Sequence, residues 1–545
     1  MEGFLRTNRY ITIGYFAIWF FIGIFIVKDY GVTWDEPIMR LLGLVGLKYV
    51  NGVFGNPFTI PISNQIEDFS TFINHEYGSL FEIILAGAEF AFIKPFIYEH
   101  LQMDGDTYYL RHLITWLVFW LSSIFFYKLV RLRIKSTFIC LLGTSIFIVS
   151  PRIFADSFYN SKDIIFLAFY VINTYTLARL FSDFTYKNAL LHGLSTGLLI
   201  SIRLMGIISV ALSLTFIAAY IIFSVRKNDY KKSLFVIGTY LLASAVFIYL
   251  LWPFLWESPF SRFFEALRLM ARFVRQDSPM LYRGEFINRD QIPWHYIPVW
   301  LLITIPPFYM LLGGTGGIVV IYNVVKKAIH KNWESIHFID LYTIASLIFP
   351  IASIIFLHSI IYDGWRHLFY LYVFIAYLAT LGGYFILKAI PLKYVLYGKL
   401  GWAAVILFYI GILIKMHPQQ QVYFTMFNKF PQTAYELDYW GQSYKQSLEW
   451  LCKNSDKDSI KIAYIRIGNQ PMTMNKLVLP PQDRKRIIFT PSLKESDYYI
   501  TNYKFGDHDL LKDVPIDITD SLDKEIYTIA PLGYKINSIF TVKKQ

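Results

Sequence analysis

The segment TWDEP at residues 33–37 follows the first long apolar run and places two carboxylates, Asp35 and Glu36, next to each other. Tryptophan favours the headgroup level of a membrane and proline suits the first turn of a helix, so Trp34 and Pro37 are expected to fix the surroundings of the pair. The N-terminus of such a helix would keep the carboxylates ionised. An isolated acid after an apolar run commonly marks solvent. This pair instead predicts a general base or a cation ligand, with Asp35 and Glu36 as the catalytic candidates.

Several cations begin or flank other apolar runs on the same predicted side of the membrane. Snorkelling anchors are the ordinary explanation, and Arg203 in particular fits a helix-end anchor as well as a ligand. The bias of Lys and Arg toward the cytoplasm, however, argues against an outer arginine without a function. Cations around one cavity indicate an anionic ligand such as a phosphate or pyrophosphate. The predicted phosphate-binding residues are Arg366, His367, Lys162, Arg111 and Arg203.

Other polar motifs gather on this side, although neither the apolar runs nor the charge bias requires it. The clustering predicts a working site at the outer membrane interface, built from loops and from the ends of spans. One of its pieces, the segment SPRIFADSFYNSKD at 150–163, is expected to be a loop. The residues expected to line the substrate cavity are Trp34, His75, Glu76, Arg152, Asp156, Asn160, Asp163, Tyr362 and Asp363.

Composition limits what these motifs can mean. The chain has 545 residues, of which 55% are hydrophobic and 17% charged, as is typical of a polytopic membrane protein. Its net charge of +12 comes largely from short basic loops between apolar runs. Nucleic acid is therefore not an expected partner. The two cysteines are too few for a disulfide framework or a metal cluster.

A helix needs roughly 20 apolar residues to cross a bilayer, and the chain has about eleven runs near that length. They cover approximately 11–27, 113–127, 137–149, 164–180, 189–202, 204–223, 234–251, 297–325, 339–361, 368–387 and 400–414. The first has no cleavage site after it and is expected to be retained. With the N-terminus in the cytoplasm, the strongest basic loops all fall on the cytoplasmic side.

Residues 28–108 and 252–296 are predicted outer loops that carry helices lying on the membrane surface. The apolar segment from Glu76 resembles a span, but counting it as one would put the basic loop at 128–135 outside. Its Glu82 and Glu89 suit an interfacial helix. The segment at 259–276 has apolar residues at helical spacing and is expected to rest on the bilayer or to wall a cavity, followed by a mobile loop rich in Gly and Pro.

Composition changes after the last apolar run, which divides the chain into a membrane domain at 1–416 and a small α/β domain at 417–545. The second domain is expected to have its own modest core and, by the parity of the spans, to lie outside. A helix is predicted within ELDYWGQSYKQSLEWLCKN, and short strands are predicted within KIAYIRIG, RIIFTP and DYYITNY.

In their order along the chain, these motifs resemble the GT-C glycosyltransferases, specifically the bacterial relatives of protein O-mannosyltransferases and lipid A aminoarabinose transferases. The likeness covers TWDEP, the two surface helices, the arginine that starts the second span, SPRIFADSFYNSKD, WPFLWESP, IPWHYIP and YDGWRH. It continues through HPQQQVYFTMFNKF and ELDYWGQSYKQ. The resemblance implies a GT-C-like fold of about eleven transmembrane helices with a small C-terminal α/β extracytoplasmic domain.

The resemblance also implies an activity: inverting transfer of a sugar from a polyprenyl-phosphate donor to a lipid, glycan or protein acceptor at the outer face of the bacterial cytoplasmic membrane. Asp35 would be the catalytic base, and Arg366, Lys162 and Arg111 would face the leaving phosphate. Members of the family differ in their use of a divalent metal ion, and no ligand spacing decides the matter here. A lipid-linked sugar transporter or flippase is the alternative, but it would need polar positions through the membrane and on both faces.

Overall fold

The computed structural model describes residues 2–60, 63–93, 105–224, 230–271, 279–288, 290–330, 333–428, 430–464, 470–504 and 521–543. Parts of both predicted outer loops, and the end of the predicted helix at 259–276, lie outside these residues. The helices at the N-terminal side are α1 (Glu2–Ile26), α2 (Glu36–Val53), α3 (Leu80–Phe92), α4 (Gly105–Arg133), α5 (Thr137–Ile148), α6 (Pro151–Tyr159), α7 (Asp163–Ser182), α8 (Tyr186–Ile200), α9 (Ile207–Ser224), α10 (Tyr230–Leu251) and α11 (Pro259–Ala271). They are followed by α12 (Tyr296–Thr304), α13 (Pro307–Ile329), α14 (Ser335–Leu357), α15 (Leu371–Ala389), α16 (Val395–Met416), α17 (Pro431–Ala434), α18 (Ser443–Asn454), α19 (Gln470–Leu477) and α20 (Pro481–Arg486).

Each of the predicted apolar runs lies on one or more of these helices. Within the described residues, nine helices are long and apolar enough to cross a membrane, and the bent pair of α5 and α6 raises the number to ten. The remaining run lies on α8, whose 15 residues are fewer than the roughly 20 that a crossing needs. The predicted class, a polytopic α-helical membrane protein with a small C-terminal α/β region, is confirmed.

Two predicted boundaries were wrong, both at prolines. The segment expected to be a loop at 150–163 is largely helical: Pro151 stands in the first turn of α6, and the chain bends by 67° between α5 and α6. The run at 297–325 is two helices, α12 and α13, separated at Ile305 and Pro306. Proline has no N–H to donate to a continuing helix, so it ends one helix and opens the next.

Close helix packing in the membrane domain depends on glycine. On α8, Gly193 and Gly197 are four residues apart and both face α10, where a Cβ would collide with Ala243 and Phe247. On α13, a Cβ at Gly316 would collide with the carbonyl oxygen of Leu378 on α15. Small residues of this kind let two backbones approach within a membrane, where there is no hydrophobic effect between helices.

Buried polar side chains between the spans bond to one another. Asn173 of α7 donates to Ser195 Oγ at 3.1 Å and Thr196 Oγ1 at 3.0 Å on α8, and it accepts from Ser209 Oγ at 2.6 Å on α9. His192 of α8 likewise contacts hydroxyl groups on α7 and α9 through its two ring nitrogens. These bonds join α7, α8 and α9 through their interior faces.

The apolar segment that begins near Glu76 forms α3, a helix of 13 residues. Its two acids do not sit at a water interface as expected. Glu89 accepts from Arg40 Nε at 2.9 Å and from Arg111 Nη1 at 2.8 Å, and Glu82 pairs with the other terminal nitrogen of Arg111. All four side chains are at most 4% exposed, so a buried ionic network joins α2 and α3 to α4.

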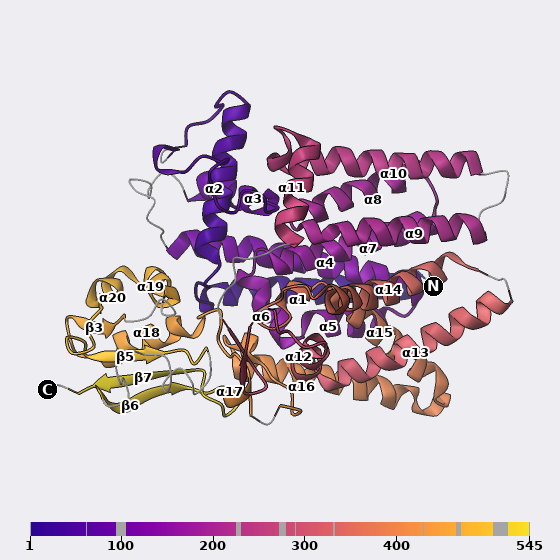
Figure 1. The fold of residues 1–545 in the computed structure, drawn as a ribbon. Helices are drawn as coiled ribbons and strands as arrows, with labels where there is room; N and C mark the ends of the chain where they lie inside the picture. The colour runs from indigo at the N-terminus through magenta and orange to yellow at the C-terminus, as the bar shows by residue number, and fades with distance from the viewer. Residues whose placement is uncertain are drawn as a thin grey trace.

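The C-terminal region contains a five-stranded sheet in the order β4-β3-β5-β7-β6, at the end of the helices opposite the N-terminus (Figure 1). Its strands are β3 (Ile460–Ala463), β4 (Ile487–Thr490), β5 (Tyr498–Thr501), β6 (Leu522–Ile529) and β7 (Asn537–Val542). β3 pairs in parallel with β4 and β5, and β7 pairs antiparallel with β5 and β6. The three predicted strands are therefore confirmed.

The helix predicted within ELDYWGQSYKQSLEWLCKN begins only at Ser443, as α18. Residues 436–442 are instead irregular, and Gly441 has φ +72°, a conformation that interrupts a helix. Apolar side chains of this segment, including Leu437 and Trp440, belong to the same buried cluster as Ile153 and Phe158 of α6. The C-terminal region is thus packed directly onto the helices.

The region predicted to be a mobile loop after α11 contains a hairpin, formed by β1 (Met280–Tyr282) and β2 (Glu285–Ile287). The two residues between its strands, Arg283 and Gly284, both have positive φ, as a tight type I′ turn requires. Tyr282 bonds to His295 Nδ1 at 2.7 Å. These contacts order the chain just before α12.

We expect Gly316→Ala to lower the stability of the protein, because the added methyl group would force α13 away from α15. Overpacking of this kind costs about 1–3 kcal/mol. Gly314→Ala is the matched control, since a Cβ there meets open space two residues away on the same helix. Thermal unfolding of both variants in the same detergent measures the difference; equal midpoints would contradict the packing role of Gly316.

Candidate active site

Asp35 and Arg366, which lie 331 residues apart in the chain, meet in the structure. Arg366 Nη1 donates to Asp35 Oδ2 at 2.7 Å. Asp35 immediately precedes α2, and Arg366 begins the short 3-10 helix Arg366–Leu368 just before α15. The Asp35 side chain is 30% exposed while that of Arg366 is 5% exposed, so the carboxylate can be reached from outside and the guanidinium supports it from within.

Glu36 has a different environment from its neighbour. Its Oε2 accepts from the backbone N–H of Thr33 at 2.7 Å and from Thr33 Oγ1 at 2.9 Å, and its Oε1 lies 2.7 Å from His112 Nε2 on α4. The side chain is only 4% exposed. Glu36 therefore anchors the first turn of α2, and Asp35 is the member of the predicted pair that faces the site.

The guanidinium of Arg366 is enclosed by acids and aromatic rings. Its Nη2 pairs with Asp363 at 3.0 Å, and the group lies 5.0 Å from the ring centre of Tyr362 and 4.7 Å from that of Trp440. Burial disfavours its charge, but Asp35 and then Asp363 raise the pKa of Arg366 above its ordinary value. Arg366 Nε has no hydrogen-bond partner among the described residues.

Arg366 in turn affects the ionisation of Asp35. Burial opposes the charged carboxylate, but the positive charge of Arg366, helped by that of Lys162, outweighs it and holds the pKa of Asp35 below its ordinary value. Asp35 is therefore ionised at neutral pH and able to accept a proton.

A second buried set of polar residues joins α6 and α7 to this pair. Asp163 at the start of α7 pairs with Arg203 and lies 3.9 Å from Arg366 Nη1. The Asn160 amide donates to Asp163 Oδ2 at 3.2 Å and to Asp156 Oδ1 at 3.0 Å. The structure thus brings four of the residues predicted from sequence into one network: Asp156, Asn160, Asp163 and Arg203.

The amine of Lys162 has a different environment from the guanidinium groups of Arg203 and Arg366. No carboxylate of the described residues lies within ion-pair distance of its amine, which is 3.8 Å from the ring centre of Tyr77. It lines a very small cavity of about 10 Å³ whose walls include Met39, Gly78 and Phe81. Burial and then the charge of Arg203 lower the pKa of Lys162 to about 7, although Asp163 opposes the shift.

The remaining predicted residues are divided between the segment around Arg366 and the loop before α3. Tyr362 contacts Arg366 as described, and the His367 ring packs edge-on against it with 4.5 Å between ring centres. Burial and then Arg366 lower the pKa of His367 well below its ordinary value, so its ring is neutral. Trp34 is 37% exposed beside Asp35. His75 and Glu76 lie in the loop before α3, where Glu76 is buried and the His75 ring lies tilted against that of Phe254, with 5.2 Å between ring centres.

Two of the predicted cations, Arg111 and Arg152, bind groups other than those around Asp35 and Arg366. Both terminal nitrogens of Arg111 bind Glu82 and Glu89, which gives Arg111 a structural environment and not one facing a phosphate. Arg152 donates to the backbone oxygen of Tyr423 at 3.0 Å and lies over the ring of Phe424 at 4.7 Å. Sequence shows that an arginine stands at a span end but does not show which carboxylate it will pair with.

Sequence reasoning did not include Trp440 or Tyr77 in the site. Trp440 covers Arg366 and donates from Nε1 to Asp156 Oδ1 at 3.2 Å, so it connects both polar networks. The glycine at position 441 was the sequence signal that residues 436–442 are not helical. Within the described parts of the chain, no three or more His, Cys, Asp or Glu side chains are grouped as a metal site.

No family model matches the chain, and no curated protein matches it. Among solved structures, it is similar to the archaeal oligosaccharyltransferase AglB from Archaeoglobus fulgidus in complex with an inhibitory peptide and a dolichol-phosphate. The identity is 12% and the TM-score 0.44, over 91% of this chain and 69% of AglB. It is also similar to ArnT from Cupriavidus metallidurans in the apo state, with 10% identity and a TM-score of 0.44 over 99% of this chain and 98% of ArnT. For ArnT bound to undecaprenyl phosphate the values are 9% and 0.43, over the same shares. Similarities with TM-scores of this size carry no conclusion about function, which depends on the contacts within this chain.

The anionic ligand that the sequence predicts for this site should bind less tightly as the pH rises above about 7, where Lys162 loses its charge. Below that pH the amine is protonated and contributes fully. In Lys162→Arg the cation stays charged, so its affinity should not show this loss. Undecaprenyl phosphate binding measured from about pH 6 to 9 for both proteins tests this, and the ionisation of the lipid itself is common to both curves. Parallel curves would contradict a role for Lys162 in binding the anion.

Proposed function

We propose that this chain is an inverting glycosyltransferase, which moves a sugar from a polyprenyl-phosphate donor to an acceptor at the outer face of the bacterial cytoplasmic membrane. One observation carries the proposal: a partly exposed, ionised Asp35 lies beside a cluster of buried and partly buried cations, of which Lys162 has no carboxylate partner among the described residues. A base next to an anion-binding surface is what transfer from a lipid phosphate needs.

In the proposed reaction, the acceptor hydroxyl attacks the anomeric carbon of the donor sugar from the face opposite the phosphate. Asp35 takes the hydroxyl proton while the new C–O bond forms. The bond from the anomeric carbon to the phosphate oxygen breaks, and polyprenyl phosphate leaves with the bonding electrons. The ionised state of Asp35, maintained by Arg366, makes it the acceptor of that proton.

The leaving phosphate gains negative charge as this bond breaks. Lys162 is the cation best placed to stabilise it, because its amine carries no competing ion pair among the described residues and its charge already acts on Asp35. Arg203 and Arg366 each have a buried Nε without a hydrogen-bond partner in the described part of the chain. Such donors stabilise developing charge strongly where water is excluded.

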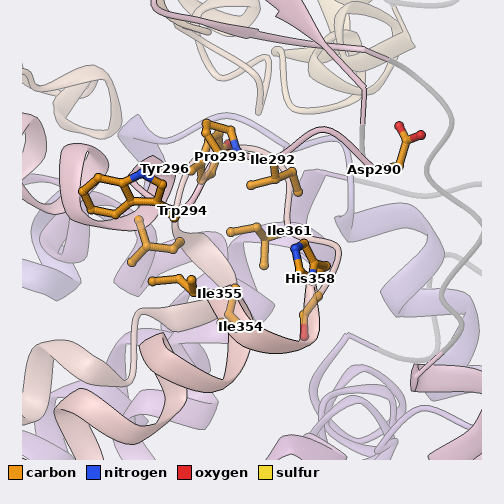
Figure 2. Close-up of a pocket in the computed structure, with 11 residues that line it drawn as sticks. Asp290, Ile292, Pro293, Trp294, Tyr296, Ile354, Ile355, His358 and Ile361 are labelled. Atoms are coloured by element: carbon orange, nitrogen blue, oxygen red, sulfur yellow. The ribbon is translucent and has the colours of Figure 1, made fainter.

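A pocket of about 240 Å³, lined mainly by apolar side chains but also by Asp290, His358 and Ser359, is suited to part of the lipid chain of the donor. Figure 2 shows Ile361 between Ile292 on one side and Ile354 and Ile355 on the other. Since Ile361 directly precedes Tyr362, the pocket is continuous in sequence with the wall of the site. Exposed Trp294 borders it, as tryptophan commonly does at a membrane surface.

The proposed topology has the N-terminus in the cytoplasm and the C-terminal domain outside. In Figure 1 the five-stranded sheet and α2 lie toward one end of the helices and the N-terminus toward the other, as this topology requires. The acceptor is a lipid, a glycan or a protein. A divalent metal ion is used by some members of the family that the sequence resembles, but every step proposed here runs through the side chains of this chain.

The buried polar groups in the spans favour transfer over transport. Asn173 uses its amide nitrogen and oxygen in bonds to neighbouring helices, and His192 contacts hydroxyls through both nitrogens. Polar groups satisfied in this way hold helices together and do not line a path for a sugar.

We expect Asp35→Asn to reduce sugar transfer by about 10²–10⁴-fold, the usual contribution of a general base, because the amide cannot take up the acceptor proton. Turnover is measured with purified full-length protein and the polyprenyl-phosphate-sugar fraction of its host membranes. Binding of undecaprenyl phosphate should persist, since Lys162 and Arg203 remain.

Asp68→Asn is the matched control, because Asp68 is 75% exposed in the same outer loop and pairs only with Lys48 among the described cations. This variant should transfer sugar at the normal rate. Full turnover by Asp35→Asn would overturn the assignment of Asp35 as base. Sugar crossing the bilayer of proteoliposomes without transfer to any acceptor would favour the transporter instead.

A further inference from the structure

The segment that leads into Asp35 is bound by side chains of the C-terminal domain. Gln442, just before α18, holds both polar groups of Gly31: its Oε1 accepts from the Gly31 N–H at 2.7 Å, and its Nε2 donates to the Gly31 oxygen at 3.0 Å. A carboxamide that bonds to an N–H and a C=O together acts as a neighbouring strand would. Gln442 therefore fixes the position of the Gly31 backbone, in addition to joining the C-terminal domain to this segment.

Asn475 of α19 does the same for the next residue. Its Oδ1 accepts from the Val32 N–H at 2.9 Å, and its Nδ2 donates to the Val32 oxygen at 2.9 Å. The Asn475 amide also donates to the Pro471 oxygen at 2.8 Å within its own helix, which fixes its orientation. We call Gln442 and Asn475 the amide clamp.

The amide clamp is buried and closely fitted. Gln442 is 1% exposed and Asn475 is not exposed at all, so no water can replace a bond that is lost. Gly31 leaves no room for a side chain, because a Cβ there would collide with Asn475 Oδ1 and approach the backbone oxygen of Gln442 to 3.0 Å. An unmade hydrogen bond at such a place costs about 1–3 kcal/mol.

The residues after the clamp transmit this fixation to the site. The Trp34 N–H donates to the Trp440 oxygen at 3.1 Å, and the Trp440 ring covers Arg366. On the other side of Asp35, Glu36 is fixed to α4 through His112. Asp35 is thus held between an anchor in the membrane domain and an anchor in the C-terminal domain.

We propose that Gln442 and Asn475 are positioning residues for Asp35, so that the C-terminal domain is a working part of the active site. The inference rests on the proposed function, since it assumes that Asp35 is the base. Loss of either amide would let the chain at 31–35 move while leaving the cations that bind the donor in place. A displacement of about 1 Å at a catalytic group can lower turnover by about 10²-fold.

The first test compares Gln442→Met and Asn475→Leu with Gln446→Met in the full-length protein. Gln446 is the matched control because it lies one turn further along α18 and bonds to Tyr527 Oη and the Gln419 side chain, not to the segment before Asp35. Hydrogen exchange should rise about tenfold in peptides covering 28–35 in both clamp variants and stay unchanged in the control. Unchanged exchange in both clamp variants would overturn the clamp.

The second readout separates positioning from general damage to the fold. Turnover should fall by about 10²-fold in the clamp variants, whereas affinity for undecaprenyl phosphate should stay within about twofold of the original protein. Normal turnover with raised exchange would overturn the positioning role, as would a parallel loss of lipid affinity.

The hydrogen bonds of the amide clamp can also be disrupted by a substitution at Gly31, in the segment that the clamp binds. Gly31→Ala should reproduce the raised exchange and the lowered turnover, while Gly52→Ala, where a Cβ meets open space, should change neither. The Asp35→Asn variant keeps the two proposals distinct. If that variant is fully active, the proposed function fails, and the exchange measurements still decide the clamp; if it is inactive and the clamp variants are normal, only the positioning role fails.

Discussion

The ion pair between Asp35 and Arg366 determines how the rest of the site is arranged. Taking a guanidinium out of water is unfavourable unless acids and hydrogen bonds replace the solvent. Here Asp35 and Asp363 provide the acids, at 2.7 and 3.0 Å, and aromatic faces cover the remaining surface. The start of α2 and the start of α15 must therefore stay in register. Any change that separates them leaves a buried charge without its partner.

That constraint also explains how one site can contain a base and an anion ligand. A carboxylate repels a phosphate, so the two must be separated by positive charge. Arg366 already compensates Asp35, and Arg203 compensates Asp163. Lys162 has no described carboxylate within ion-pair distance, and burial together with its cationic neighbours lowers its pKa although Asp163 and Asp35 oppose the shift. A bound phosphate would supply the missing negative charge, so the site is electrostatically prepared for an anion at this position.

Sequence was sufficient for the helical membrane class, for three of the strands, and for the prediction that Asp35, Arg366, Lys162 and Arg203 belong to one site. It was not sufficient to choose between possible partners. Arg111 stands at a span end just as Arg366 does, but α3 places Glu82 and Glu89 seven residues apart on one face, where both reach Arg111. Which arginine is left to pair with Asp35 depends on this packing, and no local pattern around either arginine encodes it.

The boundary at residue 416 is where composition changes, but it does not separate the site from the rest of the molecule. A domain attached only through a tether could not hold Asp35 to the tolerance that proton transfer requires. This C-terminal domain instead meets the membrane domain through bonds that leave little freedom: two carboxamides on consecutive residues, a backbone bond from Trp34, and an indole lying on the guanidinium. Polar composition predicted a separate folding region after residue 416. Its buried amides, which composition cannot distinguish from exposed ones, connect it to the chemistry.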